Sequence, residues 1–309
     1  MLVPIVSPLT EICYIIIAMA KGMNKNRPIV LKGAKPQKMK AREESAGDEN
    51  TGGADMENTS VIFWFSGTGN SLYAAKQLAA GLGDISLVQI TGGAPPSAVG
   101  GEGEKVGFVV PSYFCNMPRA ASVFIEKLEI RPGTYIFGIV TMGAMGQGTV
   151  DAISRAVKAK GLELDYGRGV LMPANYVLKY NPADPEKAKA KLDKAEESLR
   201  AFAEDIKAGK KLYKGFPFNG KNLYKNIEAL DKGFSAGGAC TGCGICEKVC
   251  PVGNILMEGG KPKWQGGCEH CVACISWCPE KVIDFEGRTQ SRRRYRHPKI
   301  TVEDLLKQG

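Results

Sequence analysis

Residues 60–71 read Ser60-Val-Ile-Phe-Trp-Phe65-Ser66-Gly67-Thr68-Gly69-Asn70-Ser71, and this stretch decides the fold class of the first half of the chain. Its first six residues form a nearly continuous apolar run, which is typical of a strand buried in a parallel sheet. Apolar residues then recur at helical spacing from Leu72 to Leu82. A strand, a glycine-rich loop and a helix start aim main-chain N–H groups and hydroxyls at one anion. The alternative is an ordinary glycine turn capped by Asn70 or Ser71.

Two common nucleotide-binding motifs are excluded, because the loop lacks residues that each of them requires. A Walker-type loop requires a Lys before its Ser or Thr, and residues 66–71 contain none. The GxGxxG spacing of a dinucleotide fingerprint is also absent from this loop. The loop therefore predicts a phosphate site without a cationic side chain, and no NAD(P)H site is visible.

Further strands alternate with helices, which predicts a doubly wound parallel sheet of five strands. In the final helix, Leu192, Leu199, Phe202 and Ile206 recur at helical spacing among charges and are expected to face the core. The expected strands are residues 60–65, 85–90, 106–110, 135–141 and 169–172, and the expected helices are residues 72–82, 118–128, 149–160 and 185–207.

Two cysteine runs of identical spacing indicate a second domain. Residues 240–251 and 268–279 both follow the pattern CxxCxxCxxxCP. This pattern is typical of the runs that hold 4Fe-4S clusters in bacterial two-cluster ferredoxins, where the fourth cysteine ligates the other cluster. The spacing assigns Cys240, Cys243, Cys246 and Cys278 to one cluster, and Cys268, Cys271, Cys274 and Cys250 to the other.

The two runs belong to an internal repeat with an offset of 28 residues, which also relates Ile255 to Ile283 and Gly259 to Gly287. The repeat predicts two pseudo-symmetric βαβ-like halves. Disulfides and structural zinc are the alternatives. Disulfide frameworks do not repeat this dense spacing, and zinc needs only two CxxC pairs for each ion. His270, between two of the cysteines, is expected to shape the surroundings of one cluster.

The overall composition agrees with a two-domain redox protein. A chain of 309 residues has room for about two domains. Eight of the ten cysteines lie in the two runs, which leaves Cys13 and Cys115, and Cys115 is expected to be a small buried residue. Thiolate ligation points to the reducing cytoplasm. With two histidines and no clear acid–base pair, hydrolytic or acyl-transfer chemistry is not expected.

The 66–71 loop resembles the FMN-phosphate loop of flavodoxins, which bind the phosphate without a cationic side chain. The resemblance implies that FMN phosphate is held by Ser66, Gly67, Thr68, Gly69, Asn70 and Ser71. It also implies that the flavin ring lies over two later loops, at the carboxyl ends of the third and fourth strands. The expected ring contacts are Ser112, Tyr113, Phe114, Asn116, Met142, Gly143, Gly146 and Gly148. Asn175 and Tyr176 are weaker candidates.

Residues 59–286 together resemble the flavodoxin–ferredoxin fusion proteins of anaerobic bacteria and archaea. The resemblance implies one FMN, two 4Fe-4S clusters and electron transfer to or from a redox partner, either a ferredoxin-type donor or an acceptor oxidoreductase. The chain departs from the pattern of this family at Val252-Gly253-Asn254, directly after the first Cys-Pro pair. Two alternatives stay open: a flavin-dependent oxidoreductase with its own small-molecule substrate, and a redox-sensing interaction module. A carrier is favoured over a substrate-specific enzyme.

The remaining segments are expected to lie outside the two folded domains. The apolar residues 1–20 are interrupted by Pro4, Pro8 and Glu11, so stable membrane insertion is not expected. Residues 1–58 are expected to be a disordered or non-native extension, with Met56 as a candidate start. Residues 210–238 are expected to link the flavodoxin-like domain (59–209) to the ferredoxin domain (239–287). Residues 288–309 form a basic tail, expected to be solvated; nucleic acid is not the expected partner.

Overall fold

The computed structural model describes residues 60–213 and 230–306. The expectations for residues 1–58, and those for residues 214–229 of the predicted linker, lie outside the described residues. All described residues belong to one unit of the chain, Gly53–Gly309.

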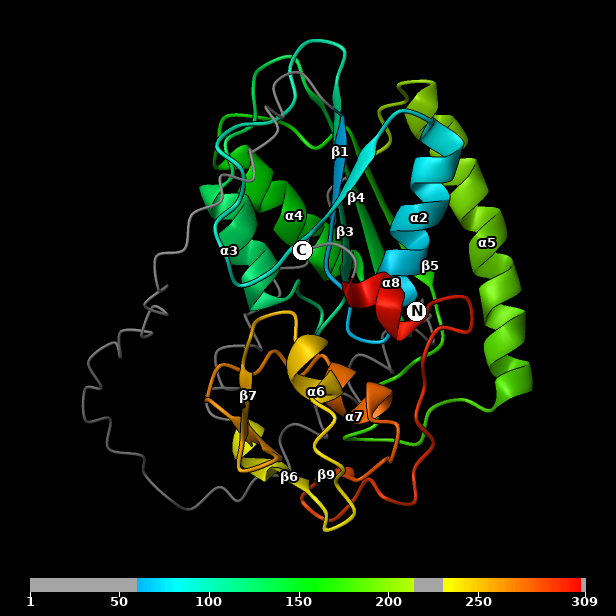
Figure 1. The fold of residues 1–309 in the computed structure, drawn as a ribbon. Helices are drawn as coiled ribbons and strands as arrows, with labels where there is room; N and C mark the ends of the chain where they lie inside the picture. The colour runs from blue at the N-terminus through cyan, green and yellow to red at the C-terminus, as the bar shows by residue number, and fades with distance from the viewer. Residues whose placement is uncertain (1–59, 214–229, 307–309) are drawn as a thin grey trace, which may run out of the picture. The chain divides into compact units, whose positions relative to one another are not determined.

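A five-stranded parallel sheet forms the centre of the first half (Figure 1). Its strands lie in the order β2-β1-β3-β4-β5, and every neighbouring pair is parallel. This is the strand order of flavodoxin-like folds, so the predicted fold class is confirmed. The strands are β1 (Val61–Trp64), β2 (Ser86–Gln89), β3 (Lys105–Pro111), β4 (Tyr135–Met142) and β5 (Tyr166–Leu171).

Helices cover both faces of this sheet, which buries all of β1. Helices α2 and α5 lie on one face, and α3 and α4 lie on the other (Figure 1). The apolar side chains of β1 are completely buried as a result. The helices are α2 (Asn70–Leu82), α3 (Arg119–Lys127), α4 (Gln147–Lys158) and α5 (Pro185–Lys207).

Helix α5 has the bounds that the sequence predicts, because its first turn is strongly specified. Asp184 accepts a hydrogen bond from the main-chain N–H of Lys187 at 3.0 Å, and Pro185 occupies the first helical position. Of the predicted core stripe, Leu199 and Ile206 are fully buried. Leu192 and Phe202 are half-buried.

The cysteine-rich half contains short strands and helices. Its elements are η2 (Leu230–Gly233), β6 (Phe234–Ala236), α6 (Ile245–Lys248), β7 (Ile255–Glu258), β8 (Lys261–Trp264), α7 (Ala273–Trp277) and β9 (Ile283–Phe285). Strand β6 pairs with β9 and β7 pairs with β8, both antiparallel. The element order is β6-α6-β7 followed by β8-α7-β9, so each half has the predicted βαβ-like order. The strands pair between the two halves rather than within one. Strand β6 also lies within the predicted linker.

The C-terminal segment of residues 288–306 returns to the sheet domain. It ends in α8 (Val302–Leu306), capped by reciprocal hydrogen bonds between Thr301 and Asp304. Lys76 on α2 donates to Asp304 at 2.6 Å, and Ile300 and Leu305 are buried in the core that includes the sheet. The expectation of a solvated tail is therefore wrong, because apolar residues between the charges anchor the segment.

Candidate functional site

The eight cysteines of the two runs surround two separate cavities. Cys240, Cys243, Cys246 and Cys278 line one, and Cys250, Cys268, Cys271 and Cys274 line the other. These are the two sets that the spacing predicts, with Cys250 and Cys278 exchanged between the runs. None of the eight forms a disulfide. That iron occupies these cavities stays a prediction.

The backbone repeats the same left-handed conformations in both halves, at the 28-residue offset. The paired positions are Gly242 and His270, Gly244 and Val272, Gly253 and Lys281, and Gly259 and Gly287, all with positive φ. Valine rarely adopts a positive φ, and such strain persists only where the surroundings impose it. The loop shape is therefore set by something other than the local preference of His270 and Val272, which the residue types alone could not reveal.

Main-chain N–H groups point at two sulfurs of the second set. Asn254 donates to Cys250 Sγ at 3.2 Å, and His270 donates to Cys268 Sγ at 3.3 Å. Such bonds stabilise thiolate ligands and tune cluster potentials. Burial raises the pKa of Cys246 to about 11, so iron binding at neutral pH must displace its proton. Donor type, grouping and N–H contacts all fit 4Fe-4S clusters.

Asn254 is one of the residues that differ from the pattern of the family that the chain resembles. Its side chain links the two cysteine runs through hydrogen bonds. Its side chain donates to Asp231 at 3.0 Å and accepts from the main-chain N–H of Gly267 at 2.5 Å. Asp231 also accepts from the N–H of Gly266 at 2.6 Å. Asn254 and Asp231 are both buried. The departure thus supplies a buried polar bridge. No sequence pattern marked the role of Asp231.

The 66–71 loop has the donors that an anion requires. Gly69 precedes α2 with a φ of 97° and donates to Ser66 Oγ at 3.1 Å. Thr68 Oγ1 accepts from Asn175 at 2.5 Å, so both hydroxyls keep their own O–H to donate. Among the described residues, none accepts from the main-chain N–H groups of Thr68, Asn70 or Ser71. The loop therefore fits a phosphate bound by neutral donors.

The same loop is in direct contact with the second cysteine run. Trp277 Nε1 donates to the carbonyl of Gly67 at 2.9 Å. A Cβ atom on Gly67 would lie 2.1 Å from the carbonyl oxygen of Cys271. Nearby, the buried carboxylate of Glu269 accepts from the main-chain N–H groups of Arg119 and Ala120 at the start of α3. The predicted anion site and the second cysteine set are thus adjacent.

The C-terminal segment also contacts this loop. The main-chain N–H of His297 donates to the carbonyl of Thr68 at 2.9 Å, and the Tyr295 hydroxyl donates to Asn70 Oδ1 at 2.7 Å. Asn70 in turn donates to the carbonyl of Pro173 at 3.2 Å. Sequence reasoning missed this support, because Tyr295 and Asn70 are 225 positions apart in the chain.

The loop after β3 forms a tight turn. Tyr113 and Asn116 exchange two main-chain hydrogen bonds, and Phe114 and Cys115 both have positive φ. Phe114 is exposed, and Cys115 is half-buried rather than buried as expected. Ser112 donates to the carbonyl of Met145 at 3.2 Å, which joins this loop to the one after β4. Two non-glycine residues in this backbone mark a strained site of the kind found at ligand contacts.

The loop after β4 is closely packed at the predicted glycines. A Cβ on Gly143 would meet Ala174 at 2.8 Å, and one on Gly146 would meet the sulfur of Met142 at 2.6 Å. Gly148 is buried inside α4 rather than in the loop. The two weaker candidates turn toward other groups: Asn175 bonds Thr68, and the Tyr176 hydroxyl bonds His270 Nδ1 at 2.8 Å. Contact of any of these residues with a flavin ring stays a prediction.

Comparison with known proteins supports the iron–sulfur interpretation. Residues 238–256 match the family model for a 4Fe-4S binding domain. Over 47 residues the chain is 43% identical to one component of an ion-translocating oxidoreductase complex from Methanosarcina acetivorans. That match covers 15% of this chain, and the chain spans only 18% of the relative's length.

Two solved structures resemble part of the chain. A putative flavoprotein from Bacteroides uniformis has a TM-score of 0.29 at 17% identity, over 44% of this chain and 99% of its own. An azoreductase from Bacillus anthracis has a TM-score of 0.31 at 14% identity, over 48% of this chain and 99% of its own.

No helix in the described part of the chain has the length and apolar character needed to cross a membrane.

Proposed function

We propose that the protein is an electron carrier of the flavodoxin–ferredoxin fusion type, which passes electrons between two 4Fe-4S clusters and one FMN, to or from a redox partner. The observation that carries this proposal is the division of eight cysteines into two sets of four, one of them in contact with a loop suited to phosphate. The proposed sheet domain is residues 59–209, and the proposed cluster domain is residues 239–287.

Each proposed cofactor has a defined set of protein groups. Cys240, Cys243, Cys246 and Cys278 would hold one cluster, and Cys250, Cys268, Cys271 and Cys274 the other. The 66–71 loop would hold the phosphate of FMN through amides and hydroxyls. When bound, a cluster exchanges one electron at a time and a flavin one or two.

The protein's own contacts would keep the sites in a fixed relation. The Trp277–Gly67 hydrogen bond and the Glu269 contacts at the start of α3 tie the second cysteine run to the sheet domain. Attachment in one chain keeps any exchange between the two halves intramolecular. Cys243 is exposed, whereas Cys271 and Cys274 are buried. The first set is therefore the better placed to meet an external redox partner.

The comparisons support the same class of function. The match to a 4Fe-4S binding domain and the similarity to a component of an oxidoreductase complex favour electron transfer with protein partners. They cover only the cysteine-rich part, so FMN and the fusion rest on the resemblance of the loops.

The test is anaerobic purification of the full chain, followed by iron, sulfide and flavin analysis. We expect about eight iron atoms per chain and about one flavin, identified as FMN by its mass. Mediated reductive titration would then follow the flavin and cluster absorption bands separately. A preparation that after reconstitution holds iron but no flavin would reject the FMN part alone. One that holds neither would reject the proposal.

A further inference from the structure

The 66–71 loop is covered by a segment from the far end of the chain. The four polar residues of the loop are each at most 6% exposed, and they are Ser66, Thr68, Asn70 and Ser71. A Cβ atom on Gly69 would lie 3.0 Å from Ile300 and 3.1 Å from His297. The strap (residues 295–300) therefore lies directly on the loop.

Tyr295 of the strap fixes the residue at which α2 begins. Its hydroxyl donates to Asn70 Oδ1 at 2.7 Å, and burial raises the pKa of Tyr295, so the hydroxyl keeps that proton. Asn70 Nδ2 donates in turn to the carbonyl of Pro173 at 3.2 Å. Both ends of the Asn70 amide are thus bonded to protein. The Asn70 side chain holds the loop in place, and the group that it leaves for a bound anion is its main-chain N–H.

His297 joins the strap to the loop and to α2. Its main-chain N–H donates to the carbonyl of Thr68 at 2.9 Å. Its ring stacks on Tyr73, with the ring centroids 4.0 Å apart. Burial lowers the pKa of His297 to about 4, so the ring is neutral at physiological pH and brings no imidazolium charge to the loop.

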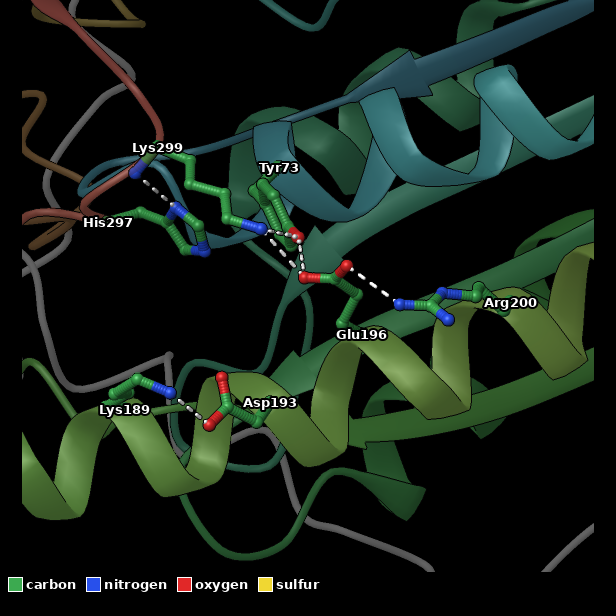
Figure 2. Close-up of polar contacts among 7 residues, drawn as sticks. All are labelled: Tyr73, Lys189, Asp193, Glu196, Arg200, His297 and Lys299. Carbon is green, nitrogen blue, oxygen red and sulfur yellow. Dashed lines mark hydrogen bonds and ion pairs between the residues drawn. The ribbon is translucent and has the colours of Figure 1, made fainter.

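Lys299 anchors the strap to two helices. Its ammonium group donates to Glu196 at 2.8 Å and to the Tyr73 hydroxyl at 3.3 Å, and Tyr73 also donates to Glu196 at 2.8 Å. Figure 2 shows this meeting of the strap, α2 and α5. The Lys299 side chain is 62% exposed, so its ion pair contributes little by itself. A strap held by a few weak contacts can open while the sheet stays folded.

We propose that the strap is part of the phosphate site: it opens to admit the phosphate group of FMN and closes on it, with Tyr295 as a positioning residue. This inference rests on the proposed function. An anion that binds better with the strap closed shifts the strap toward the closed state. By linkage, a substitution that loosens the strap weakens the binding of that anion. The strap contacts described above all reach the 66–71 loop, α2 or α5, so the effect depends on the phosphate and not on the flavin ring.

The test compares FMN with riboflavin, which has the same ring system but no phosphate. Both are titrated, by quenching of flavin fluorescence, with anaerobic full-length protein that has its clusters bound and its flavin removed. Tyr295→Phe keeps the buried ring and removes the hydrogen bond to Asn70. We expect this variant to bind FMN about fivefold more weakly, the usual effect of one hydrogen bond between neutral groups, and to bind riboflavin as tightly as the wild type.

Tyr135→Phe is the matched control. The Tyr135 hydroxyl also makes one hydrogen bond, to the carbonyl of Lys210 at 2.6 Å. Tyr135 lies at the amino end of β4, whereas the loop follows the carboxyl end of β1. Both affinities should be unchanged in this variant.

Trypsin gives a second measurement, because the strap contains cleavage sites after Arg296 and Lys299. Cleavage at these sites requires the strap to open. At about ten times its Kd, FMN should slow the cleavage about tenfold, and inorganic phosphate should also slow it. Riboflavin should leave the rate unchanged.

Unchanged FMN affinity in Tyr295→Phe, or equal weakening of FMN and riboflavin, would overturn the inference. Should this variant lose its cluster absorption, Lys299→Gln loosens the strap from an exposed position and should weaken FMN alone, about twofold. Wild-type FMN affinity in Lys299→Gln would then overturn the inference. If the wild type binds neither flavin, the FMN part of the proposed function fails. In that case protection from trypsin by inorganic phosphate supports the inference, and the absence of protection overturns it.

Discussion

Replacing Gly67 by alanine should separate the 66–71 loop from the second cysteine run. The added Cβ would lie 2.1 Å from the Cys271 carbonyl oxygen, about 0.9 Å closer than the 3.0 Å that real Cβ atoms keep. The two atoms closer than 3.0 Å are the carbonyl oxygen and carbonyl carbon of Cys271. Both belong to the main chain, so no side-chain rotation can relieve the clash. Overpacking of this kind typically costs about 1–3 kcal/mol. Because the backbone itself must move, we expect about 2 kcal/mol, or about 4–8 °C in Tm.

The assay is urea unfolding under argon, followed by far-ultraviolet circular dichroism, on protein from which flavin has been removed. Removal of flavin prevents ligand binding from adding to the measured stability. Gly93→Ala is the matched control, because its Cβ would meet only Thr91 Oγ1, at an ordinary 3.4 Å. The control should unfold at the wild-type urea concentration.

Three outcomes distinguish the possible roles of Gly67. A lower midpoint in the flavin-free protein supports the packing contact between Gly67 and Cys271. An unchanged midpoint with lost flavin binding would mean that Gly67 serves only the anion. An unchanged midpoint with normal flavin content would refute the contact with Cys271 altogether.

Three further predictions concern the Trp277 hydrogen bond, the proposed cluster ligands and the titration of His297. Trp277→Phe keeps a buried ring but removes one hydrogen bond, so unfolding free energy should fall by about 1 kcal/mol; a wild-type urea midpoint would contradict the bond. The double variant Cys250→Ser, Cys271→Ser changes two ligands of the same proposed cluster and should leave about half the iron. The double variant Cys250→Ser, Cys243→Ser changes one ligand of each proposed cluster and should leave almost none. Equal iron in the two double variants would refute the assignment of Cys250 to the cluster of the second run. For His297, the folded pKa of about 4 lies below the unfolded value near 6.5, so the unfolded chain takes up the proton first as pH falls. Between about pH 7.5 and 5.5 the wild type should therefore lose about 1.4 kcal/mol more stability than His297→Asn; parallel pH profiles would contradict this.

The sheet and its helices were predictable because their signals are local. Residues 60–71 combine a buried strand, two glycines and a helix start within a single stretch. Helix α5 is bounded by its own cap at Asp184 and Pro185. The division of cysteines likewise follows from a local signal, because the CxxCxxCxxxCP spacing is typical of runs whose fourth cysteine ligates the other cluster.

The contacts between distant segments were not predictable from local patterns. The charges of residues 288–299 suggested a solvated tail, but Tyr295, His297 and Ile300 at intervals of two and three residues decide its position. Val272 adopts a backbone conformation that valine disfavours, which residue propensity cannot anticipate. The pairing of β6 with β9 depends on the three-dimensional closure of the repeat and not on either half.

The return of residues 295–306 to α2 makes the cysteine-rich region an insertion within the sheet domain rather than an appendage at its end. Ile300 and Leu305 contribute to the same core as β1, and the Lys76–Asp304 ion pair fixes the last helix. Transplanting or deleting the cysteine-rich region would therefore require two cuts in the chain and the retention of α8. A simple truncation after the second cysteine run would open the core of the neighbouring domain.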